Sequence, residues 1–366
     1  MRVLFYYSSR SSTGAARVFA AAGRGLAERG YQVTYVCPPN GAVGARAAAE
    51  GCDVIHLDPN APVAVEGWRL QRILTERFIE TVFVHSEREQ LAVSLAVRLA
   101  GRGGVVRRTP AGGRFVAGRA TRLALRLATG GFVFASEAEV QAAAGLGVER
   151  VRETVVADLG VDVDRYDELR AAPLATVGAA PGSRIIVCVY DPSGKQRAAT
   201  VLRTMGLLAP RHPELHLVLI GPDSGNEDLR MHAAALGITR AVSHVGERDD
   251  DLAVLRAGVL GWVVAGEDSA GFGALDFMAM RTPVLVDRGS VAQRYVADGI
   301  TGVALPPGDA TATASVVAEL LANDAQREAM GNAGRVRVAR DYSERAMLDA
   351  MQRATESGRD RTRWSA

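Results

Sequence analysis

Short apolar runs alternate with longer segments of helical periodicity along almost the whole chain of 366 residues. The run Val3–Tyr7 precedes the helical segment Thr13–Ala27. The run Val33–Cys37 precedes Ala42–Glu50 in the same way. Strands that are apolar on both faces and separated by helices predict parallel sheets covered on both sides. This alternation restricts the chain to an α/β fold.

The alternation is interrupted once, in a segment rich in Ala, Gly and Pro that lacks clear periodicity. A second strand–helix series begins after it, with the apolar run Ile185–Tyr190. We therefore predict two doubly wound domains: residues 1–168, a linker over 169–183, residues 184–345, and a helix end with a polar tail over 346–366. Ligands of such sheets bind beyond the carboxyl ends of the strands, so a cleft between the domains is the expected site.

Composition excludes several classes of protein. The apolar fraction of 48% and the charged fraction of 23% are ordinary for a globular protein. No apolar run reaches the roughly 18 residues of a membrane span, and the N-terminus lacks the features of a secretory signal. The three cysteines, Cys37, Cys52 and Cys188, show no metal-binding or disulfide spacing. We expect a cytoplasmic protein without a metal site.

The arginines are unevenly distributed. Between Glu89 and Glu137 the chain has no acidic residue and eight arginines: Arg98, Arg102, Arg107, Arg108, Arg114, Arg119, Arg122 and Arg126. Such a stretch could meet an anionic membrane or substrate, or could simply form a solvated helix face. Phe115 is the one aromatic residue among these arginines, so stacking on nucleic-acid bases is not expected.

The segment Asp268–Pro283, DSAGFGALDFMAMRTP, carries the clearest functional pattern. Asp268 and Asp276 stand eight positions apart, with a glycine-bearing loop expected between them at Gly271–Gly273. A loop that leads into a helix start favours phosphate, and carboxylates on either side suit sugar hydroxyls. Asp268 could equally cap the helix. The pattern predicts a site for a sugar attached to phosphate.

Several motifs, in order along the chain, resemble those of family-4 glycosyltransferases, which have the GT-B fold and belong to group 1. The motifs are TGAARV at 13–18, VVADLGVDVDRY at 155–166, FMAMRTPV at 277–284 and DGITGVALPPGD at 298–309. The resemblance implies two Rossmann-like domains facing a cleft. It also implies transfer of a sugar from a nucleotide-sugar to a saccharide, lipid-linked or small-molecule acceptor, with retention and without a metal or cofactor.

The resemblance also implies roles for particular residues. Asp268 would be catalytic near the donor sugar, and Asp276 would accept hydrogen bonds from the ribose. The loop residues Ser269, Ala270, Gly271, Phe272 and Gly273 would present N–H groups to the donor. Both acids are usually glutamate in the family, so each carboxylate here is one methylene shorter.

The basic residues expected to meet the diphosphate are displaced in this chain. The family commonly has an arginine after the first strand of the C-terminal domain and a lysine some five residues later. Here those positions hold Asp191 and Gln196, and Lys195 and Arg197 flank the second one. A departing diphosphate needs cationic neutralisation, so we expect Lys195, as a catalytic residue, or Arg197 to supply it. Alternatively, both are solvated loop residues.

Further candidates complete the predicted site. His85 ends the strand Thr81–Val84 and could act in catalysis or be an ordinary strand-end histidine. Glu247 and Arg248 would lie near the nucleotide base, or could form a surface ion pair with each other. The acceptor side would use Thr13, Gly14, Arg107 and Arg108.

Two other functions stay open at this point. The altered acidic and basic positions could mark a catalytically weak or inactive binding or scaffold protein, and a nucleotide-sugar epimerase is a third reading. A nicotinamide enzyme is disfavoured, because no G-x-G-x-x-G follows the first strand. The expected partners are a nucleotide-sugar and a glycan or lipid-linked acceptor. We expect a role in bacterial polysaccharide biosynthesis, with peripheral contact between the protein and the inner membrane face. Nucleic acid is not an expected partner.

Overall fold

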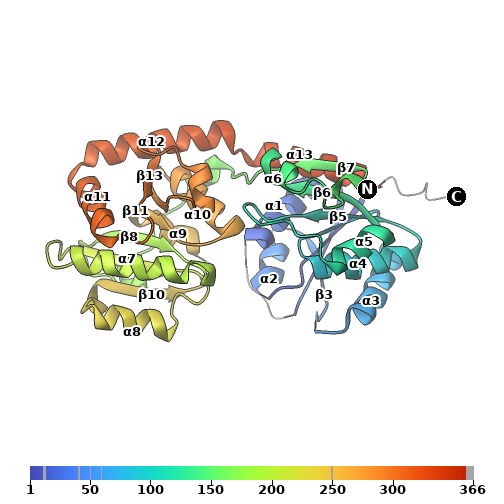
Figure 1. Cartoon of the computed structure of the whole chain (residues 1–366), viewed down its shortest axis with the longest axis horizontal. Coiled ribbons are helices and arrows are strands. Elements are labelled where there is room, and N and C mark those ends of the chain that lie inside the picture. Colours follow the sequence, from blue (N-terminus) through green and yellow to red (C-terminus); the bar gives the residue numbers. More distant parts are fainter. Residues whose placement is uncertain (11–13, 40–41, 50, 59, 249, 360–366) are drawn as a thin grey trace. The chain divides into compact units, whose positions relative to one another are not determined.

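The structure is a computed structural model that describes residues 1–10, 14–39, 42–49, 51–58, 60–248 and 250–359. It divides into two compact units (Figure 1). Unit 1 contains Met1–Leu159 and the chain from Glu344 onward, and unit 2 is Gly160–Ser343. In the described ranges no helix is long and apolar enough to span a membrane.

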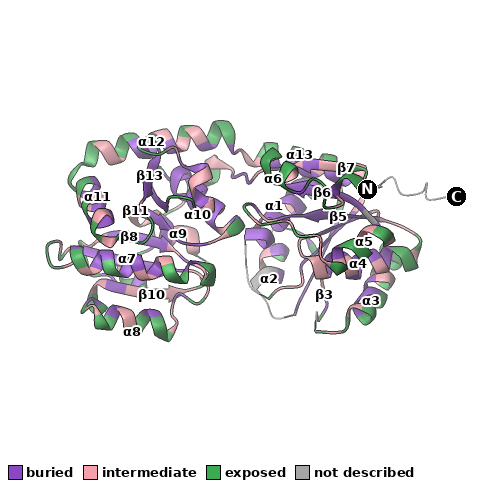
Figure 2. Ribbon diagram, in the orientation of Figure 1, coloured by how far each residue is buried: buried purple, intermediate pink, exposed green. Residues whose placement is uncertain are grey.

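Unit 1 is built on a parallel sheet of seven strands in the order β3-β2-β1-β4-β5-β6-β7. The strands are β1 (Arg2–Tyr6), β2 (Gln32–Cys37), β3 (Asp53–His56), β4 (Thr81–Val84), β5 (Gly104–Arg108), β6 (Thr129–Phe134) and β7 (Glu153–Val156). The central strands β1 and β4 are apolar on both faces and almost wholly buried, as Figure 2 shows. Their burial explains why these runs are continuously hydrophobic.

Helices cover both faces of this sheet. They are α1 (Gly14–Glu28), α2 (Ala42–Ala49), α3 (Val63–Glu76), α4 (Glu87–Ala100), α5 (Arg119–Leu127), α6 (Glu137–Ala142) and α13 (Glu344–Arg359). Right-handed crossovers place α3, α4 and α5 on one face. On the other face α1 packs beside α13, which lies against β4 to β7.

Unit 2 holds a parallel sheet of six strands in the order β10-β9-β8-β11-β12-β13. The strands are β8 (Arg184–Val189), β9 (Leu215–Ile220), β10 (Val242–Gly246), β11 (Gly258–Val263), β12 (Val284–Asp287) and β13 (Gly302–Leu305). Its helices are α7 (Lys195–Leu208), α8 (Glu227–Ala235), α9 (Asp251–Arg256), α10 (Glu267–Ala279), α11 (Ala310–Ala322) and α12 (Asp324–Asp341). Side chains from β8, β9, β11, α7 and α11 form its main hydrophobic core.

The boundaries differ from the expected ones in two places. The chain enters unit 2 at Gly160, before the predicted boundary at 168, and it returns to unit 1 at Glu344. The predicted linker 169–183 belongs to unit 2 and contains a short 3-10 helix, Leu174–Val177. Ala172 N–H donates to Ala253 O at 2.8 Å, and Val177 is buried. This segment is therefore fixed against unit 2, although its sequence lacks periodicity.

The prediction of a loop at Gly271–Gly273 is wrong. These residues lie inside α10, which begins at Glu267 after Gly266 as its N-cap. Gly273 packs against Val263 and Val189, where a Cβ would lie only 3.3–3.4 Å from their methyl groups. The glycine thus permits close packing of the helix on the sheet, and it does not serve a turn.

The return of α13 to unit 1 leads to a stability prediction. A Cβ on Gly104 of β5 would overlap the carbonyl oxygen of Gly358 in α13. We expect Gly104→Ala to lower the free energy of unfolding by about 1–3 kcal/mol, because backbone atoms must move apart. The control Gly130→Ala in β6 places its Cβ 3.4 Å from Val105 O, an ordinary contact. Equal urea midpoints for both variants would contradict the packing of α13 on β5.

Candidate functional site

The candidate site of unit 2 lies at the carboxyl ends of the neighbouring strands β8, β11 and β12. We call it the donor edge and define it by Asp191, Arg197, Gly266, Asp268 and Asp287. The turn after β8 leads into α7, and the turn after β11 leads into α10. Two helix starts therefore meet at one edge, which favours an anionic ligand.

Close backbone contact joins the two turns. A Cβ on Gly194 would overlap the carbonyl oxygen of Val264, and a Cβ on Gly266 would overlap the Ser193 hydroxyl. Asp191 closes this junction: its Oδ2 accepts from Gly266 N–H at 2.8 Å, and its Oδ1 accepts from Ser193 N–H at 2.9 Å. The acid at the family's arginine position is therefore a structural acceptor here.

Arg197, rather than Lys195, lies against the start of α10. Its Nη2 donates to the carbonyl oxygens of Val264 and Ala265 at 3.2 and 3.0 Å, and its Nε lies 3.9 Å from Asp287 Oδ2. Burial raises the pKa of Asp287, and the charge of Arg197 acts against this shift. Lys195 is largely exposed and binds Asp228 Oδ2 at 2.5 Å.

Asp268 is the second residue of α10, and its side chain is buried. Ala270 N–H donates to Gly266 O at 3.0 Å, so the N–H groups ahead of the helical ladder are those of Glu267, Asp268 and Ser269. Gly271, Phe272 and Gly273 lie deeper in the helix and are buried. The expectation that their N–H groups face the donor is therefore wrong.

Glu267 was not predicted as a site residue. It is exposed at the first position of α10 and has a φ of +43°, in the left-handed region that a glutamate rarely adopts. Backbone strain of this kind clusters at functional sites. The signal available in the sequence was the adjacent pair of acids, Glu267 and Asp268, ahead of the apolar helix.

Asp276 lies two turns further along α10 and is buried. Its Oδ1 accepts a hydrogen bond of 2.6 Å from the hydroxyl of Tyr166, which is buried in the 3-10 helix Val163–Tyr166. Asp276 is therefore held by a short hydrogen bond within unit 2. Its side chain is shorter than that of glutamate, so its carboxylate lies closer to the helix, where the hydroxyl of Tyr166 reaches it. Sequence reasoning missed Tyr166, although it lies in the VVADLGVDVDRY motif.

Arg335 of α12 fixes the same segment. Its Nη1 donates to Val163 O at 2.9 Å and to Ala279 O at 2.8 Å, and its Nη2 contacts Asp167 Oδ2 at 2.6 Å. The residues that follow the entry into unit 2 are thus held against the C-terminal end of α10. No sequence motif indicated this arginine, because its partners are far away along the chain.

Glu247 and Arg248 follow β10, the edge strand beyond β9. Arg248 makes a bidentate ion pair with Asp250, with Nε–Oδ1 at 2.6 Å and Nη2–Oδ2 at 2.8 Å. This hydrogen bond raises the pKa of Arg248. The ion-pair partner that the structure gives Arg248 is therefore Asp250, while Glu247 is exposed.

In unit 1, His85 follows the carboxyl end of β4, as expected. Its Nδ1 lies 2.7 Å from Glu89 Oε2, and its ring stacks on Tyr7 with centroids 4.8 Å apart. Glu89 also accepts from the N–H groups of Ser8, at 2.6 Å, and Ser86, at 3.0 Å. The buried carboxylate thereby fixes the imidazole at the edge of the sheet.

The electrostatics of Glu89 follow from these contacts. Burial alone raises the pKa of this carboxyl, but the charge of His85 and the hydrogen bonds from His85 and Ser8 outweigh burial and lower the pKa to about 2. Glu89 is therefore ionised under ordinary conditions, which suits a group that orients an imidazole.

The four residues predicted for the acceptor side differ in how the structure places them. Thr13 lies outside the described residues, and Gly14 is the buried first residue of α1. Arg107 is buried and donates to Gln90 Oε1 and Thr121 Oγ1, both at 2.9 Å, while burial lowers its pKa. Arg108 is only 1% exposed. The structure thus encloses Arg107 and Arg108 within unit 1. Their contact with an acceptor stays a prediction.

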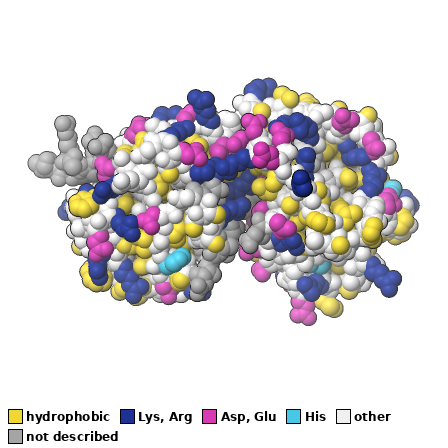
Figure 3. Space-filling view, turned by 180° about the vertical axis from the view of Figure 1, so that it is seen from behind, with side chains coloured by type: hydrophobic (Ala, Val, Ile, Leu, Met, Phe, Trp, Pro, Cys, Tyr) yellow, Lys and Arg dark blue, Asp and Glu magenta, His cyan; other side chains and the backbone are white. Residues whose placement is uncertain are grey.

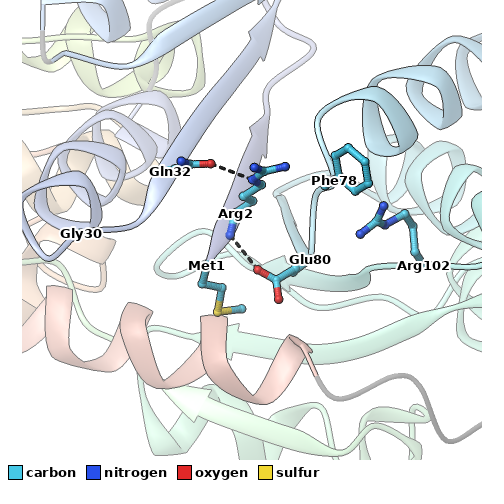
Figure 4. A pocket seen from close by; sticks show the side chains of 7 residues that line it. All are labelled: Met1, Arg2, Gly30, Gln32, Phe78, Glu80 and Arg102. Atoms are coloured by element: carbon cyan, nitrogen blue, oxygen red, sulfur yellow. Dashed lines mark hydrogen bonds between the residues drawn. The ribbon is translucent and has the colours of Figure 1, made fainter.

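A pocket of about 400 Å³ lies at the opposite, amino edge of the sheet in unit 1 (Figure 4). It is lined by Met1, Arg2, Gly30, Gln32, Phe78, Glu80 and Arg102. The guanidinium groups of Arg2 and Arg102 lie 5.3 and 4.8 Å from the Phe78 ring centroid. These contacts tie the end of α3 to β1, and the pocket is separate from His85. Among the described residues no group of three or more His, Cys, Asp or Glu is placed to hold a metal ion.

Residues 175–337 match the family model described as Glycosyl transferases group 1, which spans most of unit 2 and the whole donor edge. The lipopolysaccharide core biosynthesis glycosyltransferase LpsE of Rhizobium meliloti (strain 1021) is 26% identical over 38% of this chain and 41% of that protein. A D-inositol 3-phosphate glycosyltransferase of Corynebacterium jeikeium (strain K411) is 28% identical over 54% of this chain and 50% of that protein. The chain thus spans about half or less of the length of these curated relatives.

Solved structures share the fold along nearly the whole chain. A glycosyltransferase of Rickettsia africae ESF-5 has a TM-score of 0.79 at 15% identity, covering 97% of this chain and 98% of that one. Anabaena Alr3699/HepE in complex with UDP-glucose has a TM-score of 0.77 at 16% identity, covering 98% and 100%. These likenesses confirm the predicted α/β fold with two parallel-sheet units of GT-B type.

The lowered pKa of Glu89 gives a pH prediction. Its ionised form stabilises unit 1 above the unfolded pKa of about 4.5, and this contribution is lost as the pH falls toward 2. We expect Glu89→Gln to cost about 3 kcal/mol at neutral pH, with a deficit that shrinks below pH ~4.5. Denaturation curves at several pH values test this. The exposed control Glu76→Gln should show a small deficit at every pH, and a constant deficit for Glu89→Gln would refute the assignment.

The contact between Tyr166 and Asp276 gives a second stability prediction. Tyr166→Phe removes a buried donor to a carboxylate and should lower the free energy of unfolding by about 1.5–3 kcal/mol. The control Tyr342→Phe removes a hydroxyl that receives only a long contact of 3.4 Å from Arg337, so its loss should stay near 0.5 kcal/mol or below. Similar losses in the two variants would show that Tyr166 does not anchor Asp276.

Proposed function

We propose that this protein is a glycosyltransferase that works in the cytoplasm. Unit 2 binds a nucleotide-sugar at the donor edge, and the glycosyl group passes with retention to a hydroxyl of a saccharide, lipid-linked or small-molecule acceptor. The observation that carries the proposal is the match of residues 175–337 to the group 1 family, because this range contains α7, α10 and β12. Assignment to family 4, with no metal requirement, is part of the same proposal.

The chemistry requires the bond between the anomeric carbon and the diphosphate oxygen to break as the acceptor oxygen bonds to that carbon. The electron pair leaves with the diphosphate, and the acceptor hydroxyl passes its proton to an oxygen of the departing diphosphate or to the imidazole of His85. Arg197 and the starts of α7 and α10 supply positive charge for the departing diphosphate. The carboxylate of Asp268 stabilises positive charge on the oxocarbenium-like carbon. Lys195, at the start of α7, is a second cation for the diphosphate if it exchanges Asp228 for the ligand.

His85 is the proposed acceptor-side group of unit 1. Glu89 holds Nδ1 of the imidazole, so Nε2 is the ring nitrogen available to a hydroxyl of the substrate. A histidine oriented by a buried carboxylate is well suited to position a hydroxyl or to take up its proton. Its placement at the carboxyl end of β4 matches the edge at which ligands of doubly wound sheets bind.

The donor we propose to test first contains uridine. The HepE structures from Anabaena hold UDP or UDP-glucose on this fold. A mannosyltransferase of Mycolicibacterium smegmatis that is named for GDP-mannose is 29% identical over 48% of this chain, so guanosine donors come next.

A binding or scaffold protein is the second candidate. It is favoured by the firm contact between Asp276 and Tyr166 and by Asp191 at the position of a family arginine. Such a protein would bind a nucleotide without turnover. A nucleotide-sugar epimerase would convert the donor without an acceptor. A structure from Listeria monocytogenes that is named as a UDP-N-acetylglucosamine 2-epimerase shares the fold with a TM-score of 0.69.

Arg197 offers the most direct kinetic prediction. We expect Arg197→Met to lower kcat about 100-fold, because one preorganised cation near the leaving group is lost. The measurement is release of nucleoside diphosphate from a panel of nucleotide-sugars with and without acceptors. Arg203→Met, an exposed change on the same helix, is the matched control and should retain the wild-type rate. Unchanged turnover in Arg197→Met would remove this residue from the mechanism.

A further inference from the structure

Helices α3, α4 and α5 pack side by side on one face of unit 1 (Figure 1). We call this the α3–α5 face and define it by the outward side chains of these helices and their flanking segments. The described large hydrophobic residues of unit 1 that are most exposed lie on this face, at the amino edge of the sheet (Phe78) or just beyond α6. They are Val65, Trp68, Phe78, Leu99, Val116, Leu123 and Leu146. Trp68 and Leu99 are 55% and 56% exposed, and exposed apolar side chains that gather on one face mark an interaction site.

Arginines surround these apolar side chains. Arg119, Arg122 and Arg126 project from one stripe of α5, with Leu123 between them, while Thr121 and Ala124 face inward. Arg98 of α4 and Arg69 of α3 add to the same face. All five are exposed, and within the described part of the chain none of them forms an ion pair. Their positive charge is therefore not neutralised by the fold.

The acids near this face are engaged elsewhere. Glu87 accepts from Thr121 N–H at 2.9 Å at the start of α5, and Glu66 is buried and pairs with Arg88 at 2.6 Å. Glu76 pairs with Arg72. The face thus combines exposed apolar groups with a net positive charge.

The helices on the other side of unit 1 have a different character. Arg24 pairs with Glu344 at 2.7 Å, and Arg29 pairs with Asp349 at 2.6 Å. The exposed residues Arg345 and Arg353 of α13 share their helix with Asp349 and Glu356. Seen from behind, the surface of the molecule carries basic, acidic and hydrophobic side chains (Figure 3). Within the described residues of unit 1, an excess of arginine together with exposed apolar groups is therefore found on the α3–α5 face.

We infer that the α3–α5 face docks on an anionic lipid bilayer. Arginines attract anionic headgroups, and Trp68 with its neighbouring aliphatic side chains suits the boundary between headgroups and acyl chains. A second copy of the chain is a poor occupant, because a two-fold interface would bring arginines against arginines. A nucleic acid would need more stacking platforms than Trp68, because Phe78 lies at the amino edge against Arg2 and Arg102.

The test is sedimentation of the full chain with vesicles of phosphatidylcholine and phosphatidylserine at low salt, compared with vesicles of phosphatidylcholine alone. Binding should require phosphatidylserine and should weaken as salt is added. Arg122→Gln/Arg126→Gln should weaken binding at least about tenfold, since each well-placed arginine contributes about fivefold. Arg345→Gln/Arg353→Gln removes the same charge from α13 and should bind like the wild type.

Apolar insertion has its own readout. Tryptophan emission should shift to shorter wavelength when vesicles are added, and Trp68→Phe should lose most of this shift. The inference is overturned if the wild type stays in solution with phosphatidylserine vesicles, or if the change in α13 weakens binding as much as the change in α5. A second copy of the chain would cover the face instead if the wild type does not bind vesicles and elutes as a dimer. The double variant Trp68→Ser/Leu123→Ser would then elute as a monomer, and the inference would be overturned.

Discussion

A backbone contact that only glycine permits brings the starts of α7 and α10 together in unit 2. Gly194 lies so close to the Val264 carbonyl that no side chain fits between them, and Asp191 closes the junction through the N–H of Gly266. The two helix dipoles therefore act on the same edge of the sheet. Arg197 is held against the carbonyls that end β11, so its charge is fixed before any ligand arrives. The proposed diphosphate site depends on this junction.

The departures from the family's usual residues are connected by geometry. Asp191 cannot neutralise a phosphate and takes a structural role, and Arg197, on the next turn, is the cation that we propose for the diphosphate. The shorter side chain of Asp276 is met by the hydroxyl of Tyr166. In unit 1 a comparable arrangement holds His85, because buried Glu89 collects hydrogen bonds from three loop and helix-start N–H groups. In both units a carboxylate that accepts backbone N–H groups thus organises the edge that we propose to bind substrate.

Sequence alone was sufficient for the two parallel sheets, because continuous apolar strands separated by helices leave few alternatives. It was not sufficient for Gly271–Gly273, because a glycine required for close packing on Val189 and Val263 has the same letter as a glycine in a turn. The periodicity of α13 did not reveal that it packs on unit 1. The sequence put Arg107 on the acceptor side and could not show that it is buried against Gln90 and Thr121, because these partners are distant in the sequence. Partners brought together only by the fold account for most of these errors.

The central claim is that the donor edge of unit 2 binds a nucleoside diphosphate. The most direct measurement is a thermal-unfolding screen of the full chain against UDP, GDP, ADP, dTDP and CMP and their sugar conjugates. A ligand at about 100 times its Kd should stabilise the folded state by about 2.7 kcal/mol, which is a readable shift. The account predicts such a shift for one base, with the shift lost in Arg197→Met and kept in Arg203→Met. No shift with any nucleotide would contradict the claim.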